Sequence, residues 1–387
     1  MIYDVVVVGS GPAGAIVAYE LAKQGFTVLI LDKAKLPRYK PCGGGITYKT
    51  IREFPYEIQP AIDLKSEGII LSFGGKQLLK TDLQKNVAWM VMRDQFDYYL
   101  VQKAIEAGAR VKDSTRVSDV NLREGDVEII TDKGYFHSQI VVGADGVNST
   151  IARSLNLLSN RETGVALEAE VGVPSVSLRK QGAYATFDFG ALPNGYGWIF
   201  PKKDHFSIGV FHAKKERLSS IKFYFQRFIE SQNVLARHSL MNICGHRIPL
   251  GWKTGKLHTH RAILVGDAAN LADPWLGEGI YYAVSSAKIA ANVIKESLDV
   301  DIERLQEYSQ IIFRRIGKQF IQARNLAYLT YKFPNFSLYL LQNDPYLQEV
   351  VFGTIHGDNN FQKANRYLLK QFPRIIFLAL RYRSLHK

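Results

Sequence analysis

The chain has 387 residues, 47% of them hydrophobic, and its 49 Lys and Arg residues outnumber its 36 Asp and Glu residues, giving a net charge of +13 at pH 7. This length and composition predict a folded protein with a sizeable core, built from two substructures rather than one. The positive charge suits nucleic acid, an anionic membrane surface or an anionic substrate. Two cysteines, Cys42 and Cys244, exclude a disulfide framework and a cysteine-rich metal site, so we expect a reducing compartment and no metal.

The first element is an apolar strand close to the start of the sequence. The run YDVVVVG begins at residue 3 and leaves no room for the charged and apolar regions of a secretory signal. No later stretch approaches the roughly 20 apolar residues of a membrane-spanning helix. We therefore expect a cytoplasmic protein.

Residues 2–32 have the pattern of a dinucleotide-binding βαβ unit. We expect a buried strand over residues 2–8, a glycine turn, a helix to about residue 24 and a second strand ending at Asp32. The motif G-x-G-x-x-G allows a tight turn, close approach of a pyrophosphate and close packing of helix on strand, while Asp32 can accept ribose hydroxyls. Purely structural glycines are the alternative. The expected cofactor contacts here are Gly9, Gly11, Pro12, Ala13, Gly14, Asp32 and Lys33.

The stretch YKPCGGGITYKT at residues 39–50 places Cys42 directly before Gly43, Gly44 and Gly45. Three consecutive glycines suit a backbone surface against which a flat or charged ligand lies, although a flexible loop is the simpler interpretation. We expect the cofactor ring to lie against these glycines, with Cys42 beside it. The thiol then either takes part in the chemistry or fills space as a small hydrophobic group.

Two later turns each place an aspartate after a strand. The strand ending at Gly143 leads into Asp145, and a strand at residues 261–265 leads into a loop that opens a long helix. A carboxylate at a strand end can hold the ribitol hydroxyls of a flavin, and a helix N-terminus can present N–H groups to its electron-rich ring edge. Nicotinamide needs no such second loop, so the turns favour FAD, although each alone could be a plain connection. The expected contacts are Asp145, Gly266, Asp267, Pro274, Gly277, Glu278, Gly279 and Ile280.

The N-terminal fingerprint, the GADG segment and GDAA…P…GEG together resemble FAD-dependent reductases and hydroxylases of the para-hydroxybenzoate hydroxylase fold, over residues 2 to about 295. The resemblance implies an α/β protein with a Rossmann-type FAD-binding domain, a β-sheet substrate cap and a C-terminal helical region. VMRDQFDYYL at residues 91–100 also fits, because these enzymes have an Arg-x-x-Phe-Asp segment whose arginine lies near the cofactor. This role is assigned to Arg93, with a surface helix cap or ion pair as the alternative.

Two further stretches, KPCGGG at residues 40–45 and GYGWIFPKKDHFSIGV at residues 195–210, resemble the geranylgeranyl reductases. The family pattern is Y-x-W-x-F-P, followed after seven or eight residues by G-x-G. Tyr196, Trp198 and Phe200 match it, but Phe211 replaces the second glycine, so the pattern does not define the pocket's shape or the substrate. The three aromatic residues alternate and share one strand face. They either line an apolar tunnel or form the ordinary buried face of a sheet.

The resemblance implies reduction of carbon–carbon double bonds in a geranylgeranyl or related prenyl chain, with hydride from reduced flavin and a proton for the neighbouring carbon. An isolated alkene is a poor hydride acceptor, so Cys42, Tyr196 and Trp198 are the candidate catalytic residues, and Tyr196, Trp198 and Phe200 the candidate substrate contacts. The expected electron donor is NADPH or a ferredoxin-like protein, bound transiently. Two alternatives remain: a FAD-dependent monooxygenase acting on a lipid or aromatic substrate, and a membrane-surface binding module with structural FAD.

The motifs predict a discontinuous FAD-binding domain at residues 1–65, 91–160 and 258–300, a cap at residues 66–90 and 161–257, and a C-terminal helical region at residues 301–387. We expect the cap segments to form one sheet. From residue 359 onward there are seven Lys or Arg residues and no acidic residue. This basic tail, which includes IIFLAL, could hold the protein at an anionic bilayer, with a helix packed on its own domain as the alternative. Nucleic acid is not expected, and the oligomeric state is not predicted.

Overall fold

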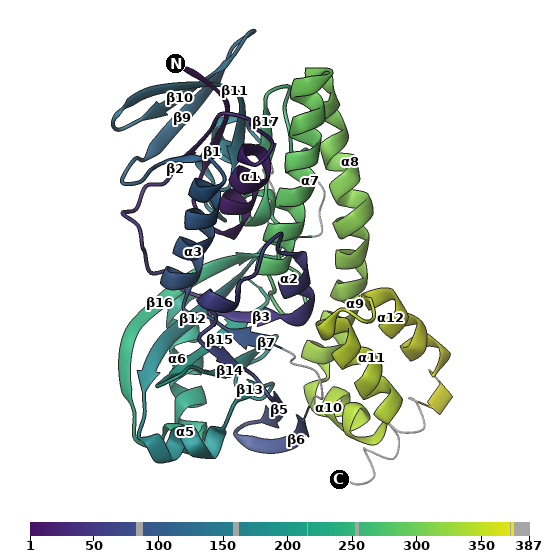
Figure 1. The fold of residues 1–387 in the computed structure, drawn as a ribbon. Helices are drawn as coiled ribbons and strands as arrows, with labels where there is room; N and C mark the ends of the chain where they lie inside the picture. Colours follow the sequence, from purple (N-terminus) through teal and green to yellow (C-terminus); the bar gives the residue numbers. More distant parts are fainter. Residues whose placement is uncertain (83–87, 158–161, 215, 252–254, 372, 375–387) are drawn as a thin grey trace.

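The computed structural model describes residues 1–387 except residues 83–87, 158–161, 215, 252–254, 372 and 375–387. Figure 1 shows a first sheet near the N-terminus, a second sheet at the opposite end of the molecule, and a group of C-terminal helices beside the second sheet. The long helix α7 (Ile280–Asp299) runs beside the first sheet. The site described below lies between the two sheets.

The first sheet has the order β8-β2-β1-β11-β10-β9, with β17 paired to the end of β11. Its parallel strands are β1 (Ile2–Val8), β2 (Val28–Leu31), β8 (Arg110–Lys112), β11 (Gly134–Gly143) and β17 (Ala262–Leu264). At one side of the sheet, β10 (Val127–Thr131) pairs antiparallel with both β11 and β9 (Val117–Leu122). Helix α1 (Pro12–Ala22) contacts both α3 (Arg93–Glu106) and α7. β2 is buried along its whole length, as expected for a central parallel strand covered on both faces.

The second sheet has the order β16-β12-β15-β14-β13-β5-β6. Its strands are β5 (Gly68–Phe73), β6 (Lys76–Asp82), β12 (Thr163–Gly172), β13 (Tyr184–Asp188), β14 (Gly195–Pro201), β15 (Phe206–His212) and β16 (Ser239–Pro249). Helix α6 (Leu218–Ser231) packs on one face through Phe225 and Phe228, with α5 (Ser175–Gln181) nearby. We propose that this sheet is the substrate cap, built from two separate segments of the chain.

One strand inside the range 66–90 lies outside the second sheet. β7 (Ala88–Met90) pairs with β3 (Gly45–Thr47) and β4 (Leu64–Lys65) in a small third sheet. Met90 is opposite Gly45, so this pairing joins the glycine-rich stretch to the start of α3. The short helices α2 (Tyr48–Glu53) and α4 (Thr150–Ser154) follow β3 and β11.

Two of the C-terminal helices, α10 (Pro334–Asn343) and α11 (Pro345–His356), pack on the inner, aromatic face of the second sheet. The other three lie elsewhere: α8 (Tyr308–Ile312) packs against α7 in the core of the first sheet, and α9 (Lys318–Lys332) and α12 (Phe361–Lys370) contact each other next to α10 and α11. Leu341 of α10 and Leu347 of α11 belong to the same apolar cluster as Trp198 and Phe211. These helices therefore close one end of the space in front of the sheet.

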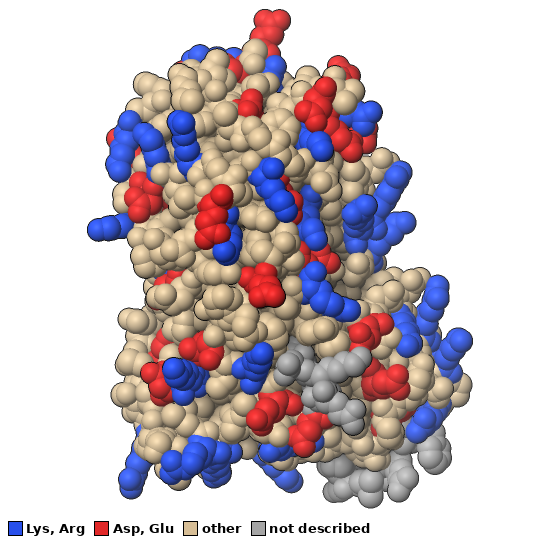
Figure 2. Space-filling view, viewed as in Figure 1, with Lys and Arg blue, Asp and Glu red and all other residues tan. Residues whose placement is uncertain are grey.

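The first half of the basic tail is a packed helix. In α12, Phe361 and Ala364 are buried against α9 and α11, while Lys363, Arg366 and Lys370 are exposed. Figure 2 shows Lys and Arg side chains on the C-terminal helices, at the right of the view, with Asp and Glu among them. The segment IIFLAL, with Arg381, Arg383 and Lys387, lies outside the described residues. Within the described residues, no helix combines the length and apolar character needed to cross a membrane.

Candidate active site

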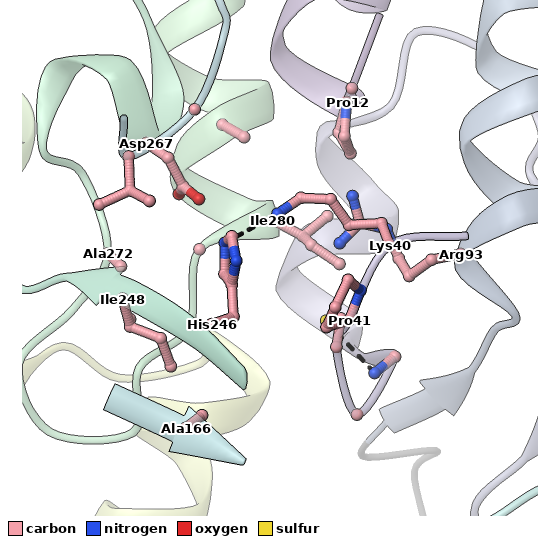
Figure 3. A pocket seen from close by; sticks show the side chains of 18 of the residues that line it. Pro12, Lys40, Pro41, Arg93, Ala166, His246, Ile248, Asp267, Ala272 and Ile280 are labelled. Atoms are coloured by element: carbon pink, nitrogen blue, oxygen red, sulfur yellow. Dashed lines mark hydrogen bonds between the residues drawn. The ribbon is translucent and has the colours of Figure 1, made fainter. Parts of the chain in front are cut away.

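A cavity of about 600 Å³ lies where the carboxyl ends of β1 and β2 face the inner side of the second sheet. Figure 3 shows Pro12, Lys40 and Arg93 on one side of it, and Asp267, Ala272, His246 and Ile248 on the other. Most of the predicted contacts line this cavity: Gly9, Gly11, Pro12, Ala13, Asp32, Lys33, Cys42, Gly43, Gly44, Gly45, Arg93, Asp145, Tyr196, Trp198, Phe200, Asp267, Gly277, Glu278, Gly279 and Ile280. Gly14, Gly266 and Pro274 are not part of its lining.

The glycine turn after β1 forms a cradle for phosphate. Gly9 has a φ of +105°, and a Cβ there would lie 2.4 Å from the carbonyl oxygen of Ala144. A Cβ on Gly14 would lie 1.9 Å from the carbonyl oxygen of Gly9, so Gly14 serves the packing of α1 rather than the cavity. A Cβ on Gly11 would lie 3.7 Å from the Arg38 guanidinium, an ordinary van der Waals contact, and no side chain caps the N-terminus of α1. The uncapped N–H groups suit a diphosphate.

The carboxylate of Asp32 is fixed at the end of β2. It accepts hydrogen bonds from the backbone N–H groups of Ser10 and Ala34, both at 2.9 Å, and from the Ser10 hydroxyl. The guanidinium of Arg38 lies 3.6 Å away. These bonds hold Asp32 beside the glycine turn, where an adenosine ribose would lie when a dinucleotide occupies the cradle.

The loop between β17 and α7 is organised by an aspartate that sequence reasoning missed. Buried Asp273 accepts hydrogen bonds from the N–H groups of Trp275, Leu276 and Glu278 at 2.8–3.0 Å. Burial, together with the charge of Glu278, raises the pKa of Asp273 to about 6. The loop directs the Asp267 side chain into the cavity (Figure 3).

Two predicted carboxylates have partners within the protein. Glu278 forms an ion pair with Lys49 at 2.6 Å and accepts a hydrogen bond from the Thr47 hydroxyl. Asp145 accepts the N–H of Thr150 at 2.6 Å, at the start of α4, but its Oδ1 atom is buried and has no hydrogen-bond partner among the described residues. An orphaned oxygen of this kind beside the cavity suits a hydroxyl of a bound cofactor.

The three glycines after Cys42 leave room for the protein's own side chains. A Cβ on Gly43 would lie 2.8 Å from the Phe200 ring and 2.9 Å from Nε1 of Trp198. Gly44 has a φ of +68°, and a Cβ there would lie 2.2 Å from the carbonyl oxygen of Val91. The buried ammonium of Lys202 donates to the carbonyl oxygens of Gly43 and Val91 at 2.9 and 2.8 Å. The bare backbone is therefore needed for contact with β14, in addition to any contact with a ring in the cavity.

Arg93 connects Cys42 to the ribose end of the site. Its guanidinium donates two hydrogen bonds to Asp97, both at 2.8 Å, and Arg38 donates a third at 3.1 Å. The Cys42 side chain lies beside the same guanidinium. Burial opposes the charge of Arg93, but Asp97 keeps the pKa of the guanidinium above its ordinary value. Arg93 is thus both a buried ion-pair partner and part of the cavity wall.

The aromatic residues of β14 form the cavity wall that faces the loops after β1 and β2. Tyr196 packs within 6.3 Å of Trp198 and 5.5 Å of Phe211, measured between ring centroids. The Tyr196 hydroxyl donates to the carbonyl oxygen of Leu276 at 2.6 Å, and burial raises the pKa of Tyr196 above its ordinary value. Phe211 is 1% exposed and lines the cavity, so it occupies volume that a glycine there would leave open.

Sequence reasoning missed a polar contact across the cavity. The Lys40 ammonium donates a hydrogen bond of 2.9 Å to Nε2 of His246 on β16 (Figure 3). Burial lowers the pKa of Lys40, and burial with the nearby Lys40 charge lowers the pKa of His246 to about 3, so the imidazole is a neutral acceptor. Lys40 belongs to the KPCGGG motif, which could have marked it as a site residue. Nothing in the sequence marks His246 as one.

The cavity fits FAD: an open glycine turn at a helix N-terminus, Asp32 beside it, the orphaned oxygen of Asp145, and Asp267 near the start of α7. The family model described as FAD binding domain matches residues 2–187. The protein is therefore an FAD-binding oxidoreductase.

Comparison with similar proteins shows which family of FAD-binding oxidoreductases this chain belongs to. A digeranylgeranylglycerophospholipid reductase of Methanocaldococcus jannaschii is 32% identical over 334 residues, 80% of this chain and 82% of that protein. An uncharacterized protein of Methanosarcina barkeri is 35% identical over 86% of this chain and 83% of its own length. A geranylgeranyl bacteriochlorophyll reductase-like protein of Thermoplasma acidophilum has a TM-score of 0.81 at 23% identity, over 97% of this chain and 98% of that one. The chain belongs to the geranylgeranyl reductase family, and the predicted fold class is confirmed.

Proposed function

We propose that the protein saturates carbon–carbon double bonds of a geranylgeranyl or related prenyl chain. The observation that carries this proposal is one cavity with FAD-binding loops on one wall and buried aromatic rings on the other. Bound FAD supplies hydride when reduced. Relatives named for reduction of geranylgeranyl groups support the substrate class.

We propose that the protein's own residues bind and orient the substrate. Trp198, Phe200 and Tyr196 hold the prenyl chain, exclude water and place their π faces near any positive charge that develops on the alkene. The Tyr196 hydroxyl already donates its hydrogen bond to the carbonyl oxygen of Leu276, so we assign Tyr196 to packing rather than to proton transfer. Phe211 limits the depth of the apolar region.

Cys42 is the candidate whose chemical role can be separated from packing. Its sulfur accepts a hydrogen bond from the Gly44 N–H at 3.4 Å and contacts Arg93. Cys42→Ser is expected to retain FAD because the glycines are unchanged. If the thiol takes part in the reaction, reoxidation of the reduced enzyme by substrate slows by ~10²–10⁴-fold. A rate within about threefold of the wild type, ~0.7 kcal/mol of barrier, assigns Cys42 to packing.

The decisive experiment is anaerobic. The purified, FAD-loaded protein is reduced and mixed with geranylgeranyl diphosphate or a digeranylgeranylglycerophospholipid, and the products are analysed by mass spectrometry for additions of two hydrogens. We expect flavin reoxidation together with these additions. Substrate-dependent oxygen consumption with oxygen insertion would instead establish the monooxygenase alternative. Neither reoxidation by prenyl substrates nor oxygen uptake would favour a binding module with structural FAD.

The electron donor is proposed to be NADPH or a ferredoxin-like protein that binds transiently. Anaerobic reduction of the flavin by NADPH alone, compared with reduction by a reduced ferredoxin, distinguishes the two donors.

We also propose that the protein works in the cytoplasm at the surface of an anionic membrane, where long prenyl chains reside. The exposed cations of α12 support this arrangement, since each Lys or Arg near such a surface contributes ~1 kcal/mol. Replacing Lys363, Arg366 and Lys370 by Gln together should weaken flotation with anionic vesicles by roughly 100-fold at low salt, and change little at high salt. Equal flotation of both proteins would leave α12 as a packed helix only.

A further inference from the structure

The inner face of β12 brings a carboxyl group into the cavity. Ala166, Glu168 and Glu170 alternate along the strand and so share one face, and Ala166 and Glu168 line the cavity. Glu168 is only 2% exposed. Its Oε1 atom accepts a hydrogen bond from the Tyr39 hydroxyl at 2.7 Å, and its Oε2 atom has no partner with good hydrogen-bond geometry among the described residues, although the Cys42 N–H lies near the carboxylate. A buried carboxyl oxygen without a partner requires an explanation, because desolvation is costly.

Several neighbouring segments present charged or titratable groups to Glu168. Tyr39 and the backbone N–H of Cys42 come from the glycine-rich stretch, Glu170 from β12 itself, and Lys202 from the end of β14. Cys244 of β16 is opposite Glu168 in the sheet. Burial, the largest effect, and the charge of Glu170 raise the pKa of Glu168 to about 7, against the effects of Tyr39, the Cys42 N–H and Lys202. Glu168 is therefore partly protonated near neutral pH.

Saturation of a double bond requires a proton as well as a hydride. Among the predicted candidates, Tyr196 donates its hydroxyl proton to a carbonyl and has a raised pKa, and the indole of Trp198 is not an acid in this range. The Cys42 thiol is the competing proton donor, which the Cys42→Ser experiment tests separately. Glu168 lies next to the backbone of Cys42, on the cavity wall that the glycine-rich stretch faces. A carboxyl group whose pKa is near the working pH is the type of group that serves as a general acid.

A row of polar groups leads from the neighbouring Glu170 to the surface. Glu170, two residues along β12, lies 3.1 Å from Nε2 of His205, and Nδ1 of the same imidazole lies 2.6 Å from Asp204. The Asp204 side chain is 84% exposed. Burial opposes it, but the two carboxylates raise the pKa of His205, so this imidazole keeps a charged group beside Glu170, which in turn acts on Glu168 through its own charge.

We propose that Glu168 is the general acid that donates the proton to the prenyl double bond, and that Tyr39 is the residue that positions it. This inference rests on the proposed function. The O–H bond of Glu168 breaks and a C–H bond forms at one alkene carbon, while hydride from reduced FAD forms the C–H bond at the other. The alkene gains two electrons and two hydrogens, supplied as hydride by the reduced flavin and as a proton by Glu168, and the Glu168 carboxylate then regains a proton from solvent.

The primary test is Glu168→Gln, which keeps an oxygen acceptor for Tyr39 and removes the acidic proton. Anaerobic stopped-flow reoxidation of the reduced, FAD-loaded protein by geranylgeranyl diphosphate should be ~10²–10⁴-fold slower at neutral pH, at unchanged FAD content. The wild-type rate should fall as the pH rises through about 7, because the acid form is lost. Glu170→Gln is the matched control: it should shift this fall to lower pH, because the Glu170 charge raises the Glu168 pKa, with a much smaller loss of rate.

Tyr39→Phe keeps the proposal falsifiable if Glu168→Gln does not retain FAD. In the wild type, the hydrogen bond from the Tyr39 hydroxyl lowers the pKa of Glu168. The variant lacks this bond, so its fall in rate should occur at higher pH. A Glu168→Gln rate within about threefold of wild type, or an unshifted profile in Tyr39→Phe, overturns the assignment.

A measurement without substrate separates this inference from the proposed function. Infrared difference spectra of the FAD-loaded protein, recorded at about pH 5.5 and about pH 8.5, should show a protonated-carboxyl band that Glu168→Gln lacks. Absence of that band in the wild type overturns the role of Glu168 even if prenyl chains are reduced. A wild type that shows the band but reduces no prenyl chain overturns the proposed function, and with it this step.

Discussion

Replacing Glu168 by Gln should change how the stability of the protein depends on pH. The pKa of Glu168 rises from its ordinary value of 4.5 to about 7 in the folded protein, mainly because the carboxyl is buried. At ~1.4 kcal/mol per pKa unit, holding the ionised carboxylate in the cavity costs the folded state about 3 kcal/mol. The group suits catalysis at the expense of stability.

The sign follows from proton binding. Below pH 4.5 the carboxyl is protonated in both states and costs nothing. Between pH 4.5 and about 7 the folded protein binds more protons than the unfolded chain, so this group lowers the free energy of unfolding as the pH rises. Above about 7 the full cost is present. Wild-type Glu168 should therefore cost about 1 kcal/mol at pH 5 and roughly 3 kcal/mol at pH 8.

Urea unfolding at saturating FAD, for the wild type and Glu168→Gln at pH 5 and pH 8, measures this difference. The stability of the variant relative to the wild type should increase by about 2.5 kcal/mol between the two pH values. Comparing the two pH values cancels any constant cost of the new amide, and saturating FAD limits the contribution of ligand binding. A relative stability that is the same at both pH values, within about 0.5 kcal/mol, would refute the assigned environment of Glu168.

Three other substitutions test the site's architecture. Gly43→Ala should lower the free energy of unfolding by about 1–3 kcal/mol, because its Cβ would clash with the aromatic rings of β14. Gly125→Ala is the control, because a Cβ there meets open space. Similar urea midpoints for the two variants would contradict the packing around Gly43. Asp97→Asn should cost about 3–5 kcal/mol in the same assay, since it leaves Arg93 buried without its carboxylate, and a loss below about 1 kcal/mol would show that the ion pair matters little. Asp267→Ala should weaken FAD binding by about 10- to 150-fold in a fluorescence titration, and an unchanged affinity would argue against its contact with the cofactor.

Much of the cofactor domain could be predicted from the sequence, because its determinants are local. The turn at Gly9 needs a positive φ, and the strand and helix around it are short-range patterns that any reader of residues 2–32 can recognise. The same holds for α3 after Met92, for the strand that carries Tyr196 and Trp198, and for the long helix that begins at Ile280. Motif resemblance then supplied the family and the FAD.

The sequence also marks positions whose reason lies elsewhere in the fold. Three glycines after Cys42 indicate that bare backbone is required, but only the tertiary structure shows that the Phe200 ring and the carbonyl oxygen of Val91 occupy that space. Likewise, Pro274 and Gly266 belong to a recognisable motif, yet the fold places them outside the cavity lining.

The electrostatic character of the site was decided by the tertiary structure alone. Tyr39 and Glu168 are 129 residues apart in sequence, and Lys40 and His246 are 206 apart, so no local pattern joins either pair. A pKa depends on burial and on the charges within a few ångströms, and both are properties of the folded neighbourhood rather than of the residue type. From the sequence, Glu168 is an ordinary polar residue of a strand. Only the fold shows that it is buried beside Cys42.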